Sequence, residues 1–78
     1  MMNFFEDFIN SCCEIDKDYM IYRLDIYTSY REHLERFGAK PLNIYDFIDK
    51  MVTYNFNYNN LIFYGVRLKA EYSTLPIF

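Results

Sequence analysis

Apolar residues recur along the chain with two different periods, and the change divides it into a helical first part and a strand-forming second part. From Asn3 to about Glu14 the spacing is i, i+1, i+4, i+5, which is typical of a broad helical face. The apolar positions there are Phe4, Phe5, Phe8, Ile9, Cys12 and Cys13. Asn3 is a suitable N-cap, and acidic Glu6 and Asp7 suit the first turn of a helix. The pattern predicts a first helix with Cys12 and Cys13 as a buried pair on it.

A second helix is predicted from about Leu24 to Phe37. Its apolar stripe is Tyr27, Tyr30, Leu34 and Phe37, and its solvent face carries Arg31, Glu32, Glu35 and Arg36. Gly38 directly after the stripe and Pro41 three residues later form a strong stop signal. Between the two helices, "EIDKD" reads as a polar loop and "YMIY", from Tyr19 to Tyr22, as a short strand.

A third helix is predicted to begin after Asn43, with Asp46 three residues on in an arrangement like a capping box. Its apolar stripe is Ile44, Phe47, Ile48 and Met51, with Val52 as a further candidate. The stretch "FGAKPLNIYDFIDKM" therefore reads as a helix end, a tight break and a new helix, which is the order of a helix-turn-helix.

Beyond Tyr54 the period changes to that of strands. The runs "YNFNYNN" and "LIFYGVRL" flank Asn59-Asn60, and because Asn tolerates positive φ this pair is a plausible two-residue hairpin turn. "AEYSTLPIF" reads as an irregular tail, and residues 1–2 and 73–78 as irregular ends. We expect one α+β domain over residues 1–78, a small winged helix-turn-helix with three helices, a short strand and a C-terminal hairpin as its wing. The alternative is a helical bundle with a dangling hairpin.

The composition is that of a small domain that relies on aromatic residues, with eight Phe and nine Tyr among 78 residues. The net charge is −3, but residues 1–18 hold five acidic side chains against one lysine, while residues 19–78 hold seven basic against six acidic. An acidic total argues against nucleic-acid binding, because phosphate contacts supply most nonspecific affinity. Since the acid is concentrated at one end, the remainder could still present a mildly basic face.

Adjacent Cys12 and Cys13 are the only cysteines, and neighbouring cysteines do not close an unstrained disulfide. Two free thiols are typical of a reducing compartment, so we expect an intracellular protein. Glu6 and Asp7 interrupt the first apolar run before it could form a signal peptide, and "LIFYGV" is far too short to cross a bilayer.

No residue pattern in the sequence indicates catalysis, a cofactor or a metal. We expect the single histidine, His33, to be a surface residue of the second helix. Asp16, Asp18 and Asp25 lack the glycine and closing glutamate of a calcium loop. The chain has only Gly38 and Gly65, so it contains no glycine-rich phosphate loop. We expect the protein not to be an enzyme and to need no cofactor or metal.

A winged helix meets nucleic acid with its third helix, the turn before that helix, and its wing. The residues that these surfaces would offer here are Lys40, Tyr45, Lys50, Thr53, Asn57, Asn59, Asn60, Arg67 and Lys69. Alternation predicts that Arg67 and Lys69 share one face of the last strand, beside the wing. So few cations predict weak affinity and a shallow dependence on salt.

A second hypothesis remains open, in which the winged helix contacts protein. Asp46 and Asp49 would then suit a basic partner, and Phe4, Phe5 or the residues from Leu75 to Phe78 could supply an apolar patch. The discriminating feature is the charge on the exposed face of the third helix and on the wing.

The run from Tyr22 to Met51, together with "FYGVRLK", resembles the C-terminal winged-helix domain of primase–helicases, which occur in poxviruses and other large DNA viruses, in phages and in plasmids. The matching positions are Ile26-Tyr27, Tyr30, Gly38, Pro41-Leu42, Phe47, Tyr64-Gly65-Val66 and Leu68. The resemblance spans roughly residues 4–69. It implies a non-catalytic accessory domain in DNA replication, which contacts single-stranded, duplex or forked DNA and assists the rest of a helicase assembly in the host cytoplasm or nucleus. Any ATPase or primase activity would belong to other domains.

Overall fold

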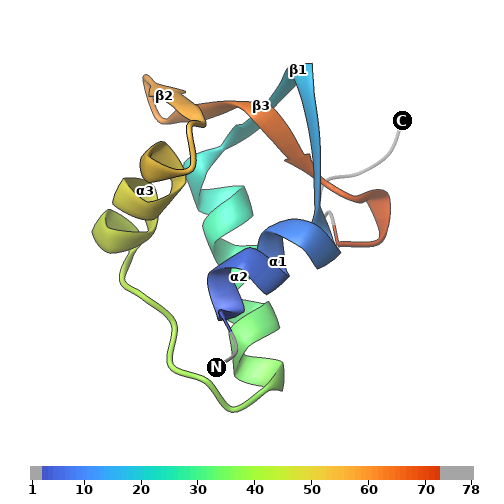
Figure 1. Ribbon diagram of the computed structural model, residues 1–78, viewed down its shortest axis with the longest axis vertical. Coiled ribbons are helices and arrows are strands. Elements are labelled where there is room, and N and C mark those ends of the chain that lie inside the picture. Colours follow the sequence, from blue (N-terminus) through green and yellow to red (C-terminus); the bar gives the residue numbers. More distant parts are fainter. Residues whose placement is uncertain (1–2, 73–78) are drawn as a thin grey trace.

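The computed structural model describes residues 3–72 as three helices and a three-stranded antiparallel sheet. In chain order the elements are α1 (Phe4–Cys12), β1 (Cys13–Tyr22), α2 (Arg23–Arg36), α3 (Ile44–Thr53), β2 (Asn57–Asn59), β3 (Ile62–Leu68) and a short 3-10 helix η1 (Ala70–Tyr72). In Figure 1, α1 crosses in front of α2, the sheet lies at one end of both helices, and α3 lies on the side of the β2–β3 hairpin. The predicted α+β class is confirmed, and the arrangement is compatible with a winged helix.

The sheet has the order β1-β3-β2, with β3 in the centre. Phe63 of β3 pairs with both Ile21 and Tyr58, and this row is turned toward the helices, since Phe63 is fully buried. Side chains alternate along a strand, so the neighbouring row, in which Tyr64 pairs with Met20 and Asn57, is turned to the other face. Because the hairpin is paired with β1 and packed on the core, the alternative of a bundle with a dangling hairpin is wrong.

The first strand is longer than the sequence predicts. β1 covers the whole expected loop "EIDKD", and it begins at Cys13, which was expected on the first helix. Its pairing with β3 is interrupted between Ile15 and Met20, where residues 16–19 lie opposite Gly65 alone. Gly65 has φ +86°, which a residue without Cβ adopts at little cost. The stretch "EIDKD" has the sequence of a loop because most of it is an exposed bulge. The residues on both sides of the bulge pair with β3, and this pairing makes them part of a strand.

The hairpin turn lies one residue later than predicted. Asn59 pairs with Ile62, so the turn residues are Asn60 and Leu61, with φ of +55° and +68°. Two consecutive positive φ values are those of a type I′ turn, whose twist matches that of the flanking strands. The Leu61 carbonyl also accepts a hydrogen bond of 2.9 Å from the Arg23 N–H, at the start of α2. The turn is thereby attached to the helix, and the register follows this contact rather than the Asn-Asn pair.

Replacing Leu61 by glycine is expected to raise the free energy of unfolding by roughly 0.5–1 kcal/mol. Leucine is strained at positive φ, and glycine is the preferred second residue of a type I′ turn, while the backbone carbonyl that caps α2 is retained. Urea denaturation measures the change. Leu61→Ala keeps the strain and should not stabilise, so equal gains from both substitutions would contradict this account.

Three helix ends carry the caps that the sequence predicts, namely the starts of α1 and α3 and the end of α2. Asn3 Oδ1 accepts a hydrogen bond from the Glu6 N–H, and Asn43 Oδ1 accepts one from the Asp46 N–H at 2.9 Å. At the end of α2, the Gly38 N–H donates to Glu35 and the Ala39 N–H to Leu34, which is a Schellman motif with Gly38 at φ +67°. The irregular tail was predicted from Ala70 onward, but residues 70–72 form η1. The predicted tail contacts of Leu75, Ile77 and Phe78 lie outside the described residues.

Two predictions for the second helix are wrong, one for a residue of its apolar stripe and one for a residue of its surface. Phe37, expected inside, is 55% exposed, because α2 ends at Arg36 and the chain turns away at Gly38. His33, expected on the surface, is buried at 6% exposure, since α1 packs over it. Ile26, which the stripe left out, is fully buried, while the predicted Tyr30 and Leu34 are confirmed in the core.

The core is an aromatic cluster around Phe47 of α3. Phe47 and Met51 are fully buried, as the stripe predicts, while Val52 is 49% exposed. The ring of Phe47 lies within 4.7–6.5 Å, centre to centre, of five others: Phe5, Phe8, Tyr27, Tyr30 and Phe63. These rings come from α1, α2 and β3, so this one side chain packs α3 against all three of those elements.

Candidate functional site

The exposed face of α3 is mixed in charge and slightly acidic. It carries Tyr45, which is 74% exposed, with Asp46, Asp49 and a single cation, Lys50. The Thr53 hydroxyl, also on this face, donates to the Asp49 carbonyl at 2.9 Å. By charge alone, this face would hold a phosphate backbone weakly, since Lys50 supplies its only positive group.

The β2–β3 hairpin adjoins the end of α3. Only three residues separate Thr53 from Asn57, and Asn57, Asn59 and Asn60 are all exposed. Lys40 is exposed in the connection that precedes α3. The fold therefore brings Lys50, Thr53 and the three asparagines toward one end of the molecule, where the sequence predicted them to act together.

Arg67 and Lys69 are not part of that group. β3 advances about 3.3 Å per residue, so Arg67 is roughly 17 Å along the strand from Ile62, at the end away from the turn. The predicted place of these two cations beside the wing is therefore wrong. Arg67 Nε lies 3.5 Å from Glu14 Oε1, and its guanidinium lies 3.8 Å above the centre of the Tyr19 ring. Arg67 thus binds β1 of its own chain.

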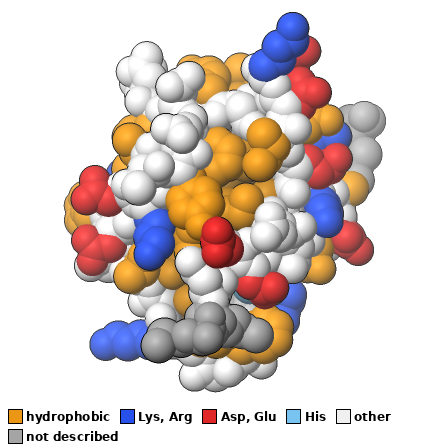
Figure 2. All heavy atoms as spheres, in the orientation of Figure 1, with side chains coloured by type: hydrophobic (Ala, Val, Ile, Leu, Met, Phe, Trp, Pro, Cys, Tyr) orange, Lys and Arg blue, Asp and Glu red, His pale blue; other side chains and the backbone are white. Residues whose placement is uncertain are grey.

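A groove of about 510 Å³ lies next to the α3–hairpin surface. It is formed by α1, the bulge of β1, the connection between α3 and β2, and β3. Its apolar lining is Ile9, Ile15, Tyr54, Phe56 and Tyr64; its polar lining is Asn10, Asp16, Lys17, Asn55 and Asn57, with Gly65 at the backbone. Figures 1 and 2 view the molecule from the same side. Apolar side chains are gathered near the centre of Figure 2, in the area that lies between α1, α3 and the sheet in Figure 1.

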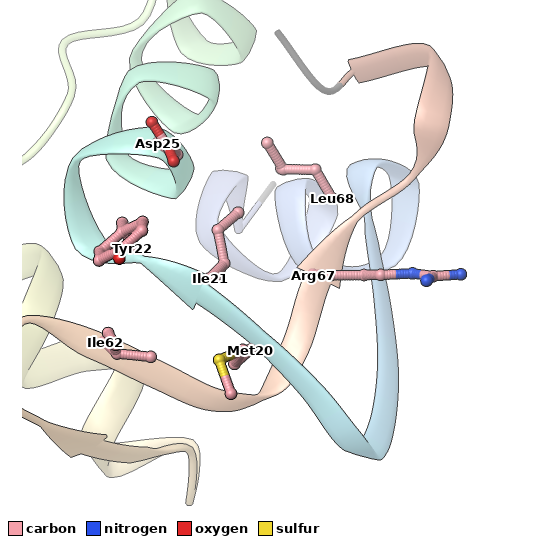
Figure 3. Close-up of a pocket in the computed structure, with 7 residues that line it drawn as sticks. All are labelled: Met20, Ile21, Tyr22, Asp25, Ile62, Arg67 and Leu68. Atoms are coloured by element: carbon pink, nitrogen blue, oxygen red, sulfur yellow. The ribbon is translucent and has the colours of Figure 1, made fainter. Parts of the chain in front are cut away.

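A second depression, of about 290 Å³, lies where β1 meets the start of α2. Met20, Tyr22 and Ile62 lie around it with Asp25 of α2, while the guanidinium of Arg67 points away from the other lining residues (Figure 3). Met20 is 58% and Tyr22 62% exposed. Leu24 and Leu61 are more than half exposed in the same region, so this edge of the molecule is an apolar surface.

The buried His33 connects α1 to α2 through two hydrogen bonds. Its Nε2 lies 2.7 Å from Asp7 Oδ2, and its Nδ1 lies 3.5 Å from Cys12 Sγ. These contacts fit the tautomer in which Nε2–H donates to the carboxylate and Nδ1 accepts from the thiol. Cys12 is fully buried, and this burial raises the pKa of its thiol. A thiol that is protonated and shielded from solvent is a poor nucleophile. We therefore interpret Asp7, Cys12 and His33 as a structural group that attaches α1 to α2.

Several of these residues were not found from the sequence. His33 is 21 positions from Cys12 and 26 from Asp7, and no local spacing pattern predicts hydrogen bonds over such separations. In the groove, Asn10, Asn55 and Tyr64 were passed over because they come from three separate elements. One signal was available, since Asn recurs at every second position from 55 to 59, as expected for one face of a strand. Asn55 has φ +70°, which marks it as the residue that turns the chain from α3 into β2.

Within residues 3–72, no group of three or more His, Cys, Asp or Glu is arranged to hold a metal ion, and both cysteines are free. No helix in that range is long and apolar enough to span a membrane. Neither known protein families, nor curated proteins, nor solved structures include a match to this chain.

Proposed function

We propose that this chain is a winged-helix domain that contacts nucleic acid and serves as a non-catalytic accessory part of a DNA-replication primase–helicase. In this proposal α2 and α3 form the helix-turn-helix, and the β2–β3 hairpin is the wing. The element order and the strand order β1-β3-β2 support it. The resemblance of residues 4–69 to the corresponding domain of viral, phage and plasmid primase–helicases supplies the replication setting.

The observation that carries the nucleic-acid part is the meeting of α3 and the hairpin at one end of the molecule. Lys50 supplies a cation for a phosphate, and the amides of Asn57, Asn59 and Asn60 can bond to phosphates or base edges. With Arg67 bound to Glu14 and Tyr19, the surface has few phosphate contacts. Affinity is therefore weak for one copy, and several copies in one assembly would act together through effective concentration.

The test is fluorescence anisotropy of labelled single-stranded, duplex and forked DNA at two salt concentrations. Lys50→Glu should weaken binding about tenfold and lower the salt slope by about 0.9, since one phosphate contact is lost. Arg67→Glu is the matched control, because it makes the same charge change at a residue that lies far from the hairpin turn. Equal losses from both substitutions would show that only net charge matters and would refute the interface.

Protein contact is the second candidate function, and the apolar edge around Met20, Tyr22, Leu24 and Leu61 favours it. Exposed Tyr, Met and Leu beside an open strand edge are typical of protein interfaces. Of the apolar patch that the sequence predicted at Phe4 and Phe5, Phe5 is buried, while the partly buried Phe4 packs on Phe37, which is 55% exposed. Absence of any salt-sensitive DNA binding at high micromolar protein would favour this function over the first.

A further inference from the structure

The groove beside the hairpin has three amide side chains without a hydrogen-bond partner among the residues that the structure describes. Asn3 and Asn43 use their amides to cap helices, but Asn10, Asn55 and Asn57 take part in none of the side-chain hydrogen bonds formed among residues 3–72. Each amide offers both donors and an acceptor. Their convergence on one groove suits a ligand that presents donors and acceptors together.

The groove also offers an aromatic surface next to bare backbone. Tyr64 is partly exposed, and its ring forms no aromatic pair with another described residue. Beside it, Gly65 has no side chain, and a Cβ built there would meet no atom within 4 Å. The bulge of β1 lies opposite Gly65, and its residues Asp16 and Lys17 line the same groove as Tyr64 and Gly65.

The charges of the groove cancel. Its lining holds one cation and one anion, the neighbouring Lys17 and Asp16. A phosphate or a carboxylate would gain little electrostatic binding energy there, whereas a neutral, flat and polar ring needs no charged partner. A purely aliphatic peptide side chain would fill the apolar part but leave the amides without partners.

The groove is continuous with the surface proposed to contact nucleic acid. Tyr54 lines this groove and also a depression that contains Lys50 and Thr53 of α3. Burial, and then the neighbouring carboxylate of Glu6, raise the pKa of Tyr54. A phosphate bound at Lys50 would therefore lie in a depression that adjoins the groove at Tyr54.

We propose that this groove takes up one unpaired nucleobase, stacked on Tyr64 and hydrogen-bonded by the amides around it. The proposal rests on the proposed contact with nucleic acid and specifies its substrate as a single strand or the unpaired arm of a fork. Amides match the polar edges of bases, and tyrosine stacks on any base. A fully paired duplex keeps its bases stacked inside and cannot fill the site.

The experiment compares the full chain on oligothymidine, oligoadenosine, duplex and an abasic strand with the same number of phosphates. Base-bearing single strands should bind on the order of tenfold more tightly than the abasic strand, as expected for one stacked base. Tyr64→Leu should abolish this difference while leaving duplex binding unchanged. Tyr22→Leu makes the same substitution on the same sheet outside the groove, and should preserve the difference.

A second variant guards against misfolding of the first. Asn57→Asp changes an exposed side chain and should narrow the gap between base-bearing and abasic strands, whereas Asn59→Asp, on the same strand but outside the groove, should weaken all probes alike. Equal binding of abasic and base-bearing strands would overturn the base site and leave the proposed function standing. If no probe binds in a salt-sensitive way, the proposed function fails, and the base site fails with it.

Discussion

Phe47→Ala is expected to lower the free energy of unfolding by about 3–5 kcal/mol, the usual cost of truncating a buried aromatic residue. Phe47 is fully buried and lies among five rings from three other elements. The surrounding rings are rigid and held by separate elements, so the space left behind would close only in part. A domain of 78 residues has a total stability on the order of 4–12 kcal/mol, so this variant should lose a large part of its stability.

Urea denaturation followed by circular dichroism measures the loss. Tyr45→Ala is the matched control, since it removes an aromatic ring from the same helix at a position that is 74% exposed. It should change stability by no more than about 0.5 kcal/mol. A loss below about 1 kcal/mol for Phe47→Ala would show that α3 is not held through this residue.

The protein should lose stability at alkaline pH through its buried thiols. Burial, and then the neighbouring Cys12, raise the pKa of Cys13 from 9.0 to about 12. Because the folded-state pKa lies above the unfolded one, the contribution is fully present below pH 9 and is lost as pH rises toward about 12. It amounts to at most about 4 kcal/mol for Cys13. Cys12 and Tyr30, whose pKa values burial also raises, act in the same direction.

The measurement is the urea midpoint as a function of pH, under reducing conditions. Cys13→Ala removes the largest of these titrations and should flatten the fall above pH 9, while costing little near neutral pH because only a small side chain is lost. A slope that is the same in the variant and in the natural sequence would mean that Cys13 does not titrate on unfolding. Some slope should persist in the variant, because Cys12 and Tyr30 remain.

The sequence predicted most residues of the candidate interface, but it wrongly included Arg67 and it did not predict the groove. Lys50, Thr53 and the asparagines of the hairpin were predicted as neighbours because the order of helix, turn, helix and hairpin determines their proximity. Arg67 was misplaced because strand alternation gives the face of a side chain but not its neighbours, and Arg67 lies beside β1 at the end of β3 away from the turn. Its ion pair with Glu14 joins residues that are far apart in sequence. The groove was missed for the same reason, since four segments must meet to form it.

The sequence by itself determined the starts of α1 and α3 and the end of α2, because a cap bonds only to residues within one turn. Asn3, Gly38 and Asn43 illustrate this, since each cap is formed by its own side chain or dihedral angle with near neighbours. It also determined that a hairpin follows Tyr54, through β-prone runs on either side of an asparagine pair. Only the tertiary structure decided that a polar stretch after Cys13 becomes strand, that His33 is buried, and which two residues form the turn. Each of these depends on pairing or burial against a segment far along the chain, and a local sequence pattern does not predict the free energy of such long-range contacts.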